Sequence, residues 1–155
     1  MEDAAQTSGT VAAGQYWLRV YGYPEQIGEE LIAYGDFYDP AVGPLPGNPK
    51  RHLHKGDVIL YYADGPASLF GVGVVEGDVE GPLPDGNLGE HWKVGVKPEA
   101  VILAMNKAVH AGALRPPSGW HFLRVVRDYT FIRLPDVDGP YLVDQVKSRA
   151  STRGE

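Results

Sequence analysis

The sequence predicts an α+β domain: a small, partly open β-barrel of five to six strands with short capping helices. At 155 residues the chain is close to the usual size of one domain and long enough to bury a core. Its 20 Gly and 13 Pro divide it into short segments, which suits strands and turns better than a helical bundle. Short runs of aromatic and β-branched residues lie between those turn residues, as expected for strands.

The first half of the chain predicts three strands and one helix. Residues 16–21 (YWLRVY) form the first strand. Pro24 and the glutamates after it predict a short helix at about 24–33, followed by a long loop at 35–49. Asn48 and Pro49 then predict a capped basic turn. The runs at 57–64 and 69–78 predict an antiparallel hairpin, in which Gly71 and Gly73 indicate close backbone packing or a bulge.

The second half predicts the remaining strands and a terminal helix. After an acidic loop at 79–90, residues 91–97 alternate as a strand, and residues 101–103 are expected to continue the sheet. A helix is predicted at 106–114, residues 122–126 fit helix and strand equally, and residues 129–134 form a last strand. Asp138, Gly139 and Pro140 open a terminal helix that runs to about Lys147. The small, polar ends predict disordered tails at 1–14 and 149–155 around one domain at 15–148.

Composition excludes several classes of function. The sequence contains no cysteine, which rules out disulfides, thiolate zinc sites and cysteine nucleophiles. His52 and His54 diverge on either a strand or a helix, so we expect no metal, and we expect no cofactor. The net charge of −6 argues against coating of long duplexes. No apolar run approaches about 18 residues and no signal-like segment begins the chain, so we expect a cytoplasmic location and no membrane partner.

Three segments, taken in order, resemble the EVE domain of the PUA-like superfamily, which also contains YTH and ASCH domains. They are YWLRVYGYPE at 16–25, NPKRHLHKGD followed by VILYY at 48–62, and LFGVGVVEG at 69–77 with HWKVGVKP at 91–98. The resemblance covers about 15–147 and is weakest at 104–126. It implies a PUA-like barrel and a nucleic-acid-binding module without catalysis. Such a module recognises a single base in an aromatic pocket. The expected ligand is a modified base, and DNA is favoured over RNA.

The residues that fit such a pocket are mostly aromatic. Extruding a base costs a few kcal/mol, and stacking on aromatic faces returns about 1–3 kcal/mol per base. The candidate pocket residues are Trp17, Tyr21, Tyr23, Tyr61, Tyr62, Asp64 and Trp120. Each has a plainer alternative: strand aromatics are more often core residues, and Asp64 beside Gly65 suits a turn cap. Of the adjacent tyrosines 61 and 62, we expect one to pack inside and the other to face the pocket or its rim.

Two basic groups are candidates for guiding the phosphates. The first is the cluster that precedes the tyrosine strand, and the second lies near the last strand. Their residues are Lys50, Arg51, His52, Lys55, Arg124 and Arg127. The alternatives are a solvated turn for the first group and salt bridges to the acidic 76–90 loop for the second.

Two other functions stay open. Some ASCH-like relatives hydrolyse modified nucleosides, but that chemistry needs a lysine-activated nucleophile, whereas the first strand offers Arg19, which does not readily lose its proton. The acidic balance of the chain also fits a small-molecule or protein-interaction module. The partner we expect is DNA or RNA carrying a modified base; a nuclease partner, and a monomeric or weakly dimeric state, are open.

Overall fold

The protein is seen in a computed structural model that describes residues 14–24, 26–32, 37–45, 48–83, 91–119 and 129–153. Its elements follow in this order: β2 (Tyr16–Tyr21), β3 (Glu30–Ile32), β4 (Phe37–Asp39), β5 (Gly43–Pro44), η1 (Pro49–Arg51), β6 (Val58–Ala63), β7 (Ser68–Val75), β8 (Glu80–Leu83), β9 (His91–Val94), β10 (Val96–Val101), η2 (Met105–Lys107), β11 (Val109–His110), η3 (Ala111–Ala113), β12 (Phe131–Arg133) and α1 (Asp138–Arg153). The domain is therefore mostly β with one C-terminal helix, broadly an α+β fold.

The strands form two sheets. The larger is a mixed sheet of eight strands in the order β10-β7-β6-β2-β12-β4-β5, with β11 also paired to β7. The pairs β2 with β6 and β12 with β4 are parallel, and the other pairs are antiparallel. The smaller sheet has the order β3-β9-β8. Over the described residues the strands form no closed barrel, and the large sheet has eight strands where a partly open barrel of five to six is predicted.

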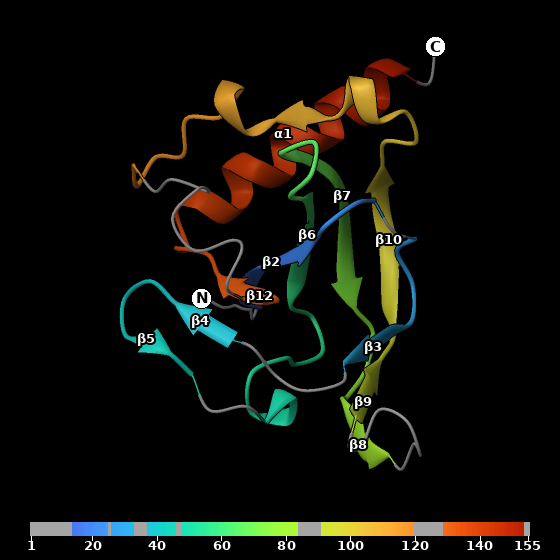
Figure 1. Ribbon diagram of the computed structural model, residues 1–155, viewed down its shortest axis with the longest axis vertical. Coiled ribbons are helices and arrows are strands. Elements are labelled where there is room, and N and C mark those ends of the chain that lie inside the picture. The colour runs from blue at the N-terminus through green and yellow to red at the C-terminus, as the bar shows by residue number, and fades with distance from the viewer. Residues whose placement is uncertain are drawn as a thin grey trace, which may run out of the picture.

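Strands β9 and β10 are nearly continuous and lead from the small sheet into the large one. Strand β9 belongs to the small sheet and β10 to the large one, and only Gly95 separates them. Figure 1 shows the small sheet beyond one end of β10 and the helix α1 across the opposite end of the large sheet. Helix α1 packs on β7 and β10 through Leu142 and Val146, which are fully buried.

The glycines of β7 let another segment lie directly on the sheet. A Cβ at Gly71 would collide with Ile27 Cδ1, and one at Gly73 would collide with Val96 Cγ1. The side chain of Ile27 therefore fills the space above Gly71, and Val96 fills the space above Gly73. This confirms the close-packing interpretation of the two glycines, and it brings the segment leading into β3 onto the face of the large sheet opposite α1.

The predicted helix at 24–33 is wrong, because Glu30–Ile32 is strand β3 and pairs with β9. Glu30 and Ile32 are buried while Leu31 is exposed, which is the two-residue alternation of a strand. The glutamates that fitted a helix N-terminus serve different ends: Glu30 is buried in an ion pair with Arg19, and Glu29 pairs with Lys93 at the surface.

Three further boundaries differ from the prediction. The loop at 35–49 contains β4 and β5, since the ring of Phe37 stacks on Phe131 in the core (5.0 Å between centroids). The helix at 106–114 is replaced by η2, β11 and η3, because β11 pairs with the start of β7. Helix α1 continues to Arg153, so the boundary predicted at 148 falls inside a helix. The strands predicted at 16–21 and 57–64, the hairpin and the Asn48 cap are confirmed.

Candidate functional site

The two adjacent tyrosines of β6 are both core residues. Tyr61 and Tyr62 are each 0% exposed, although a bulge between them shifts the register with β7. Strand β6 lies inside the large sheet between β7 and β2, and every one of its residues after Val58 is buried. The prediction that one of these rings faces a pocket or its rim is therefore wrong: a fully buried ring has no surface left for a ligand.

Trp17 is also a core residue. Its side chain is buried, meets Phe37 edge-on at 5.6 Å between centroids, and donates from Nε1 to Asp57 Oδ2 at 3.3 Å. Asp57 also accepts from the backbone N–H groups of Gln15 and His54, both at 2.9 Å. The Gly56-Asp57 pair thus ties the turn before β6 to β2, a structural role that uses up the polar edge of the Trp17 indole.

Tyr21 and Tyr61 instead belong to a polar cluster around Glu30. The carboxylate is buried and accepts from Arg19 Nε at 3.0 Å, from Tyr61 Oη at 2.9 Å, and from Tyr21 Oη at 2.8–2.9 Å. The rings of Tyr21 and Tyr61 stack with their planes 12° apart. Burial, reinforced by the negative Glu30, raises the pKa of Tyr61 far above its ordinary value, so its hydroxyl remains a donor.

The guanidinium of Arg19 is fixed in place with one edge still open. Its Cζ lies 4.1 Å from the ring centroid of Tyr21 and 5.2 Å from that of Phe131, and Nη1 donates to the Val20 carbonyl at 3.1 Å. The side chain is 13% exposed, and Nη2 makes no hydrogen bond to any described residue. A planar donor group held by an ion pair and aromatic faces is prepared to bind an acceptor-bearing ligand.

Tyr23 lies two residues after Tyr21, beyond the end of β2. It is 75% exposed, and its ring lies against the backbone of Gly65, where a Cβ would be 2.9 Å from Cε1. Gly65 in turn donates to the Gly22 carbonyl at 2.6 Å, and Asp64 stands beside it, partly exposed. Arg19, Tyr21 and Tyr23, at every second position, thus run from the interior to solvent. We call these three residues the Arg19–Tyr23 site.

The basic cluster predicted for phosphate guidance lies at the wrong end of β6. Lys50 and Arg51 in η1 and Lys55 after it are exposed and precede β6, whereas Asp64 follows the last residue of β6. A strand of six residues spans about 20 Å, so these side chains do not border the Arg19–Tyr23 site. His52 packs its ring on Phe37 at 4.7 Å between centroids. Trp120, Arg124 and Arg127 lie outside the described residues.

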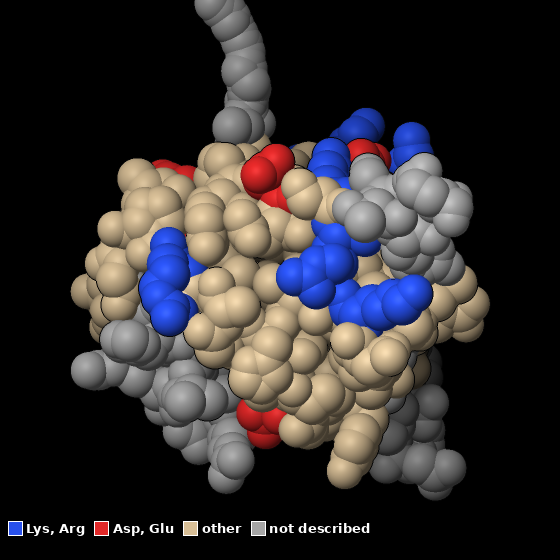
Figure 2. All heavy atoms as spheres, turned by 90° about the horizontal axis from the view of Figure 1, so that it is seen from above, with Lys and Arg blue, Asp and Glu red and all other residues tan. Residues whose placement is uncertain are grey.

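Other basic side chains do lie at the end of the sheet where β2 and β6 finish. Lys107 follows β10 in η2, Arg115 follows η3, and Arg149 is in α1 with its Nη1 3.1 Å from the Lys107 carbonyl. The Ala67 carbonyl accepts from Ala111, which ties this region to the turn after Asp64. Figure 2, which looks onto this end, shows Lys and Arg side chains there, with those at the left set apart from the rest. We call Lys107, Arg115 and Arg149 the basic end face.

Sequence patterns alone do not identify Arg19 and Glu30 as the central residues of this arrangement. The sequence pattern places Glu30 in a helix, and it presents Arg19 only as an unsuitable base. The single available signal was alternation: residues 17, 19 and 21 share one face of a strand, so an arginine among aromatics had to be buried with a partner. Nothing in the sequence shows that this partner is Glu30.

Searches for known sites and relatives add no identification. Among the described residues, no three His, Asp or Glu side chains are grouped so as to hold a metal ion, and no helix is long and apolar enough to cross a membrane. Comparison of the chain with models of protein families, with curated proteins and with solved structures finds no match. The functional interpretation therefore depends on the geometry of the Arg19–Tyr23 site and on the resemblance in sequence.

Proposed function

We propose that this protein is a non-catalytic binding domain that takes a single nucleobase of DNA or RNA at the Arg19–Tyr23 site. One observation carries the proposal: the Arg19 guanidinium is held between the rings of Tyr21 and Phe131 and anchored to buried Glu30, while Nη2 is left without a bond to the described residues. Arginine reads paired acceptors on a base edge, as in its contacts with guanine.

The energetics suit a flat ligand. Tyr23 offers an exposed ring on a backed surface, and stacking on such a ring contributes about 1–3 kcal/mol per base. The arginine is ordered before the ligand arrives, so binding loses little of the side-chain entropy that a free arginine gives up. Together these terms offset the few kcal/mol that extrusion of a base costs.

The charge distribution supports a short contact with the backbone of the nucleic acid. The chain carries a net charge of −6, yet the basic end face lies at the same end of the sheet as Tyr23. A few local contacts to phosphates need no overall positive charge. The resemblance to EVE domains makes a modified base in DNA the favoured ligand.

The hydrolase alternative finds less support in the cluster. The buried carboxylate Glu30 is paired with an arginine, whose guanidinium is a hydrogen-bond donor and does not act as a base. Both of its oxygens already accept hydrogen bonds from Tyr21 or Tyr61. A cluster saturated in this way favours binding over proton transfer.

The proposal is tested by fluorescence anisotropy with labelled single-stranded and duplex oligonucleotides, each with and without one modified base. Tyr23→Ala is expected to weaken binding by about 1–3 kcal/mol, the contribution of one stacked base. Val42→Ala, which also truncates an exposed apolar side chain but in the β4–β5 turn, is the matched control and leaves the affinity unchanged. Equal affinities for the wild type and Tyr23→Ala would remove this site as the place of binding.

The position of the phosphates is tested with two charge-matched double variants. Lys107→Gln with Arg115→Gln removes two charges from the basic end face, while Lys50→Gln with Arg51→Gln removes two from the opposite end. The Lys107 and Arg115 variant is expected to make the negative slope of log affinity against log salt shallower by about one for each phosphate that it no longer neutralises. The Lys50 and Arg51 variant is expected to leave the slope unchanged. The reverse result would place the backbone at η1.

A further inference from the structure

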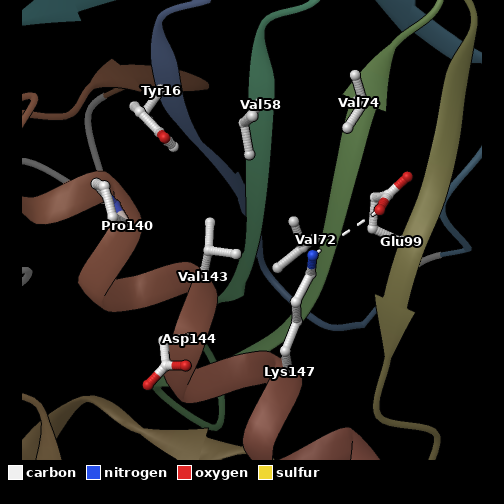
Figure 3. Close-up of a pocket in the computed structure, with 9 residues that line it drawn as sticks. All are labelled: Tyr16, Val58, Val72, Val74, Glu99, Pro140, Val143, Asp144 and Lys147. Atoms are coloured by element: carbon white, nitrogen blue, oxygen red, sulfur yellow. Dashed lines mark ion pairs between the residues drawn. The ribbon is translucent and has the colours of Figure 1, made fainter. Parts of the chain in front are cut away.

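A groove lies between α1 and the large sheet, on the face opposite the Arg19–Tyr23 site. Tyr16 and Val58 are register neighbours in β2 and β6, and Tyr16 lies an odd number of residues from Arg19, so the two sites face opposite sides of the sheet. The groove has a volume of about 320 Å³, which is within the range of small-molecule sites. Figure 3 shows Tyr16, Val143 and Lys147 beside the strand valines, with Lys147 reaching toward Glu99 and Asp144 on the far side of Lys147 from Glu99.

The floor of the groove is an apolar strip that α1 leaves partly uncovered. Val58 in β6 pairs with Val74 in β7, and both are only half-buried although they lie on inner strands. Val72 lies beside them, fully buried. The helix seats Leu142 and Val146 against the sheet and turns half-buried Val143 toward the groove. Inner strands with half-exposed valines gain stability when an apolar group covers them.

One wall of the groove is aromatic and held rigidly. The ring of Tyr16 lies directly on Gly139 at the start of α1, where any Cβ would collide with it. Because the ring is wedged between the strand and the helix backbone, it keeps its orientation without a ligand. A fixed aromatic wall beside an apolar floor suits a flat or compact hydrophobic body, and the face of such a ring attracts cations.

The rim of the groove carries an excess of negative charge. Glu99 and Lys147 form a loose ion pair at 3.9 Å, with side chains 33% and 49% exposed. Asp144 is exposed, lines the same groove, and makes no ion pair with any described residue. Two carboxylates against one ammonium leave one negative charge uncompensated. A weak, exposed pair such as Glu99 with Lys147 is readily exchanged for another cation.

We propose that this groove binds a small organic ammonium ion, with its apolar or aromatic body on the valine floor beside Tyr16 and its charged nitrogen at the rim beside Glu99. Charge complementarity selects a cation over a neutral or anionic ligand of the same shape. This binding is independent of the proposed recognition of a base, because the two sites share no residue and lie on opposite faces of the sheet.

The test is isothermal titration calorimetry of the full chain with three probes of similar shape: phenethylamine, phenethyl alcohol and hydrocinnamate. We expect saturable binding of the amine, weaker binding of the alcohol and the weakest binding of the carboxylate. Asp144→Asn and Glu99→Gln are each expected to weaken the amine by about two- to fivefold, the range of exposed charge pairs. Asp78→Asn, an exposed carboxylate in the β7–β8 connection, is the charge-matched control and has no effect.

Three results would overturn the proposal: no saturable binding of the amine, equal affinity for the amine and the alcohol, or an amine affinity that neither carboxylate variant changes. All of these substitutions are at exposed side chains and leave the core intact, so a folded protein is available for each titration. Failure here would leave the base-binding proposal unaffected, since that is read from oligonucleotide affinity and from Tyr23.

Discussion

The hydroxyl of Tyr61 donates to Glu30 Oε2 at 2.9 Å, and the two residues belong to different sheets. Tyr61 lies in β6, in the middle of the large sheet, while Glu30 opens β3 in the small one. Arg19 and Tyr21 reach the same carboxylate from β2. The Glu30 cluster therefore both fastens the small sheet to the large one and fixes the arginine that we propose reads a base.

Removing Arg19 alone is expected to be much more damaging than removing the whole ion pair. Arg19→Met leaves a buried carboxylate without its cation, which costs about 3–5 kcal/mol of unfolding free energy. Arg19→Met combined with Glu30→Leu removes both charges and should recover most of that stability. Urea denaturation of the two single variants and the double variant measures the coupling. Strictly additive effects would show that the two side chains do not interact.

Tyr61→Phe removes one donor from Glu30 and keeps the ring in the core. Because a hydrogen bond to a charged group is removed, the unfolding free energy should fall by about 1–3 kcal/mol. Tyr38→Phe is the control: its half-buried ring packs on Tyr129 and its hydroxyl bonds to no described residue, so the change should stay within about 0.5 kcal/mol. Equal effects of the two substitutions in urea titrations would contradict the cluster.

Alkaline pH is expected to destabilise the wild type through Tyr61. Its pKa is raised in the folded protein, chiefly by burial, whereas in the unfolded chain its pKa is about 10. The stabilisation is therefore complete below about pH 10 and declines as pH rises above that value, by about 1.4 kcal/mol per pH unit. Urea titrations across this range should show the stability advantage of the wild type over Tyr61→Phe shrinking. An advantage that stays constant as pH rises would refute this assignment.

The glycine at position 71 should be interchangeable with alanine only if Ile27 is shortened. Gly71→Ala drives a methyl group into Ile27 Cδ1, so we expect the unfolding free energy to fall by about 1–3 kcal/mol. Ile27→Val lacks that atom, and the double variant should be more stable than the sum of the two single effects predicts. Gly77→Ala meets no atom within 4 Å and serves as the control. Thermal or urea unfolding of all four variants measures the coupling.

Local patterns predicted the strands, and contacts between distant residues decided the rest. The alternation in 16–21 and 57–64 was enough to identify β2 and β6, and the turn residues at 65–68 were enough to pair β6 with β7. Glu30 was misassigned because an acidic residue after Pro24 fits a helix N-terminus as well as it fits a buried ion pair. The choice depends on Arg19, eleven residues earlier in the chain, and no local propensity contains that information.

Contacts between distant residues also explain why the candidate site was only partly predicted. Tyr21 and Tyr23 are placed where a ligand can reach them. Tyr61 is instead buried against Tyr21, Phe70 and Glu30, which come from three other strands. The basic end face combines Lys107 from a predicted helix, Arg115 from just after that helix, and Arg149 from a predicted tail. A cluster such as residues 50–55 is visible in sequence because it is contiguous, whereas one assembled by folding is not.

The central claim, that one base is bound at the Arg19–Tyr23 site, is tested most directly by NMR of isotope-labelled protein during titration with a short single-stranded oligonucleotide. The Arg19 Nε–H group, protected by its bond to Glu30, gives a resolvable reporter. We predict saturable shifts of that signal together with the amides of Tyr21, Tyr23 and Asp64. Shifts confined to the η1 segment, or the absence of any saturable shift for every oligonucleotide, would contradict the account.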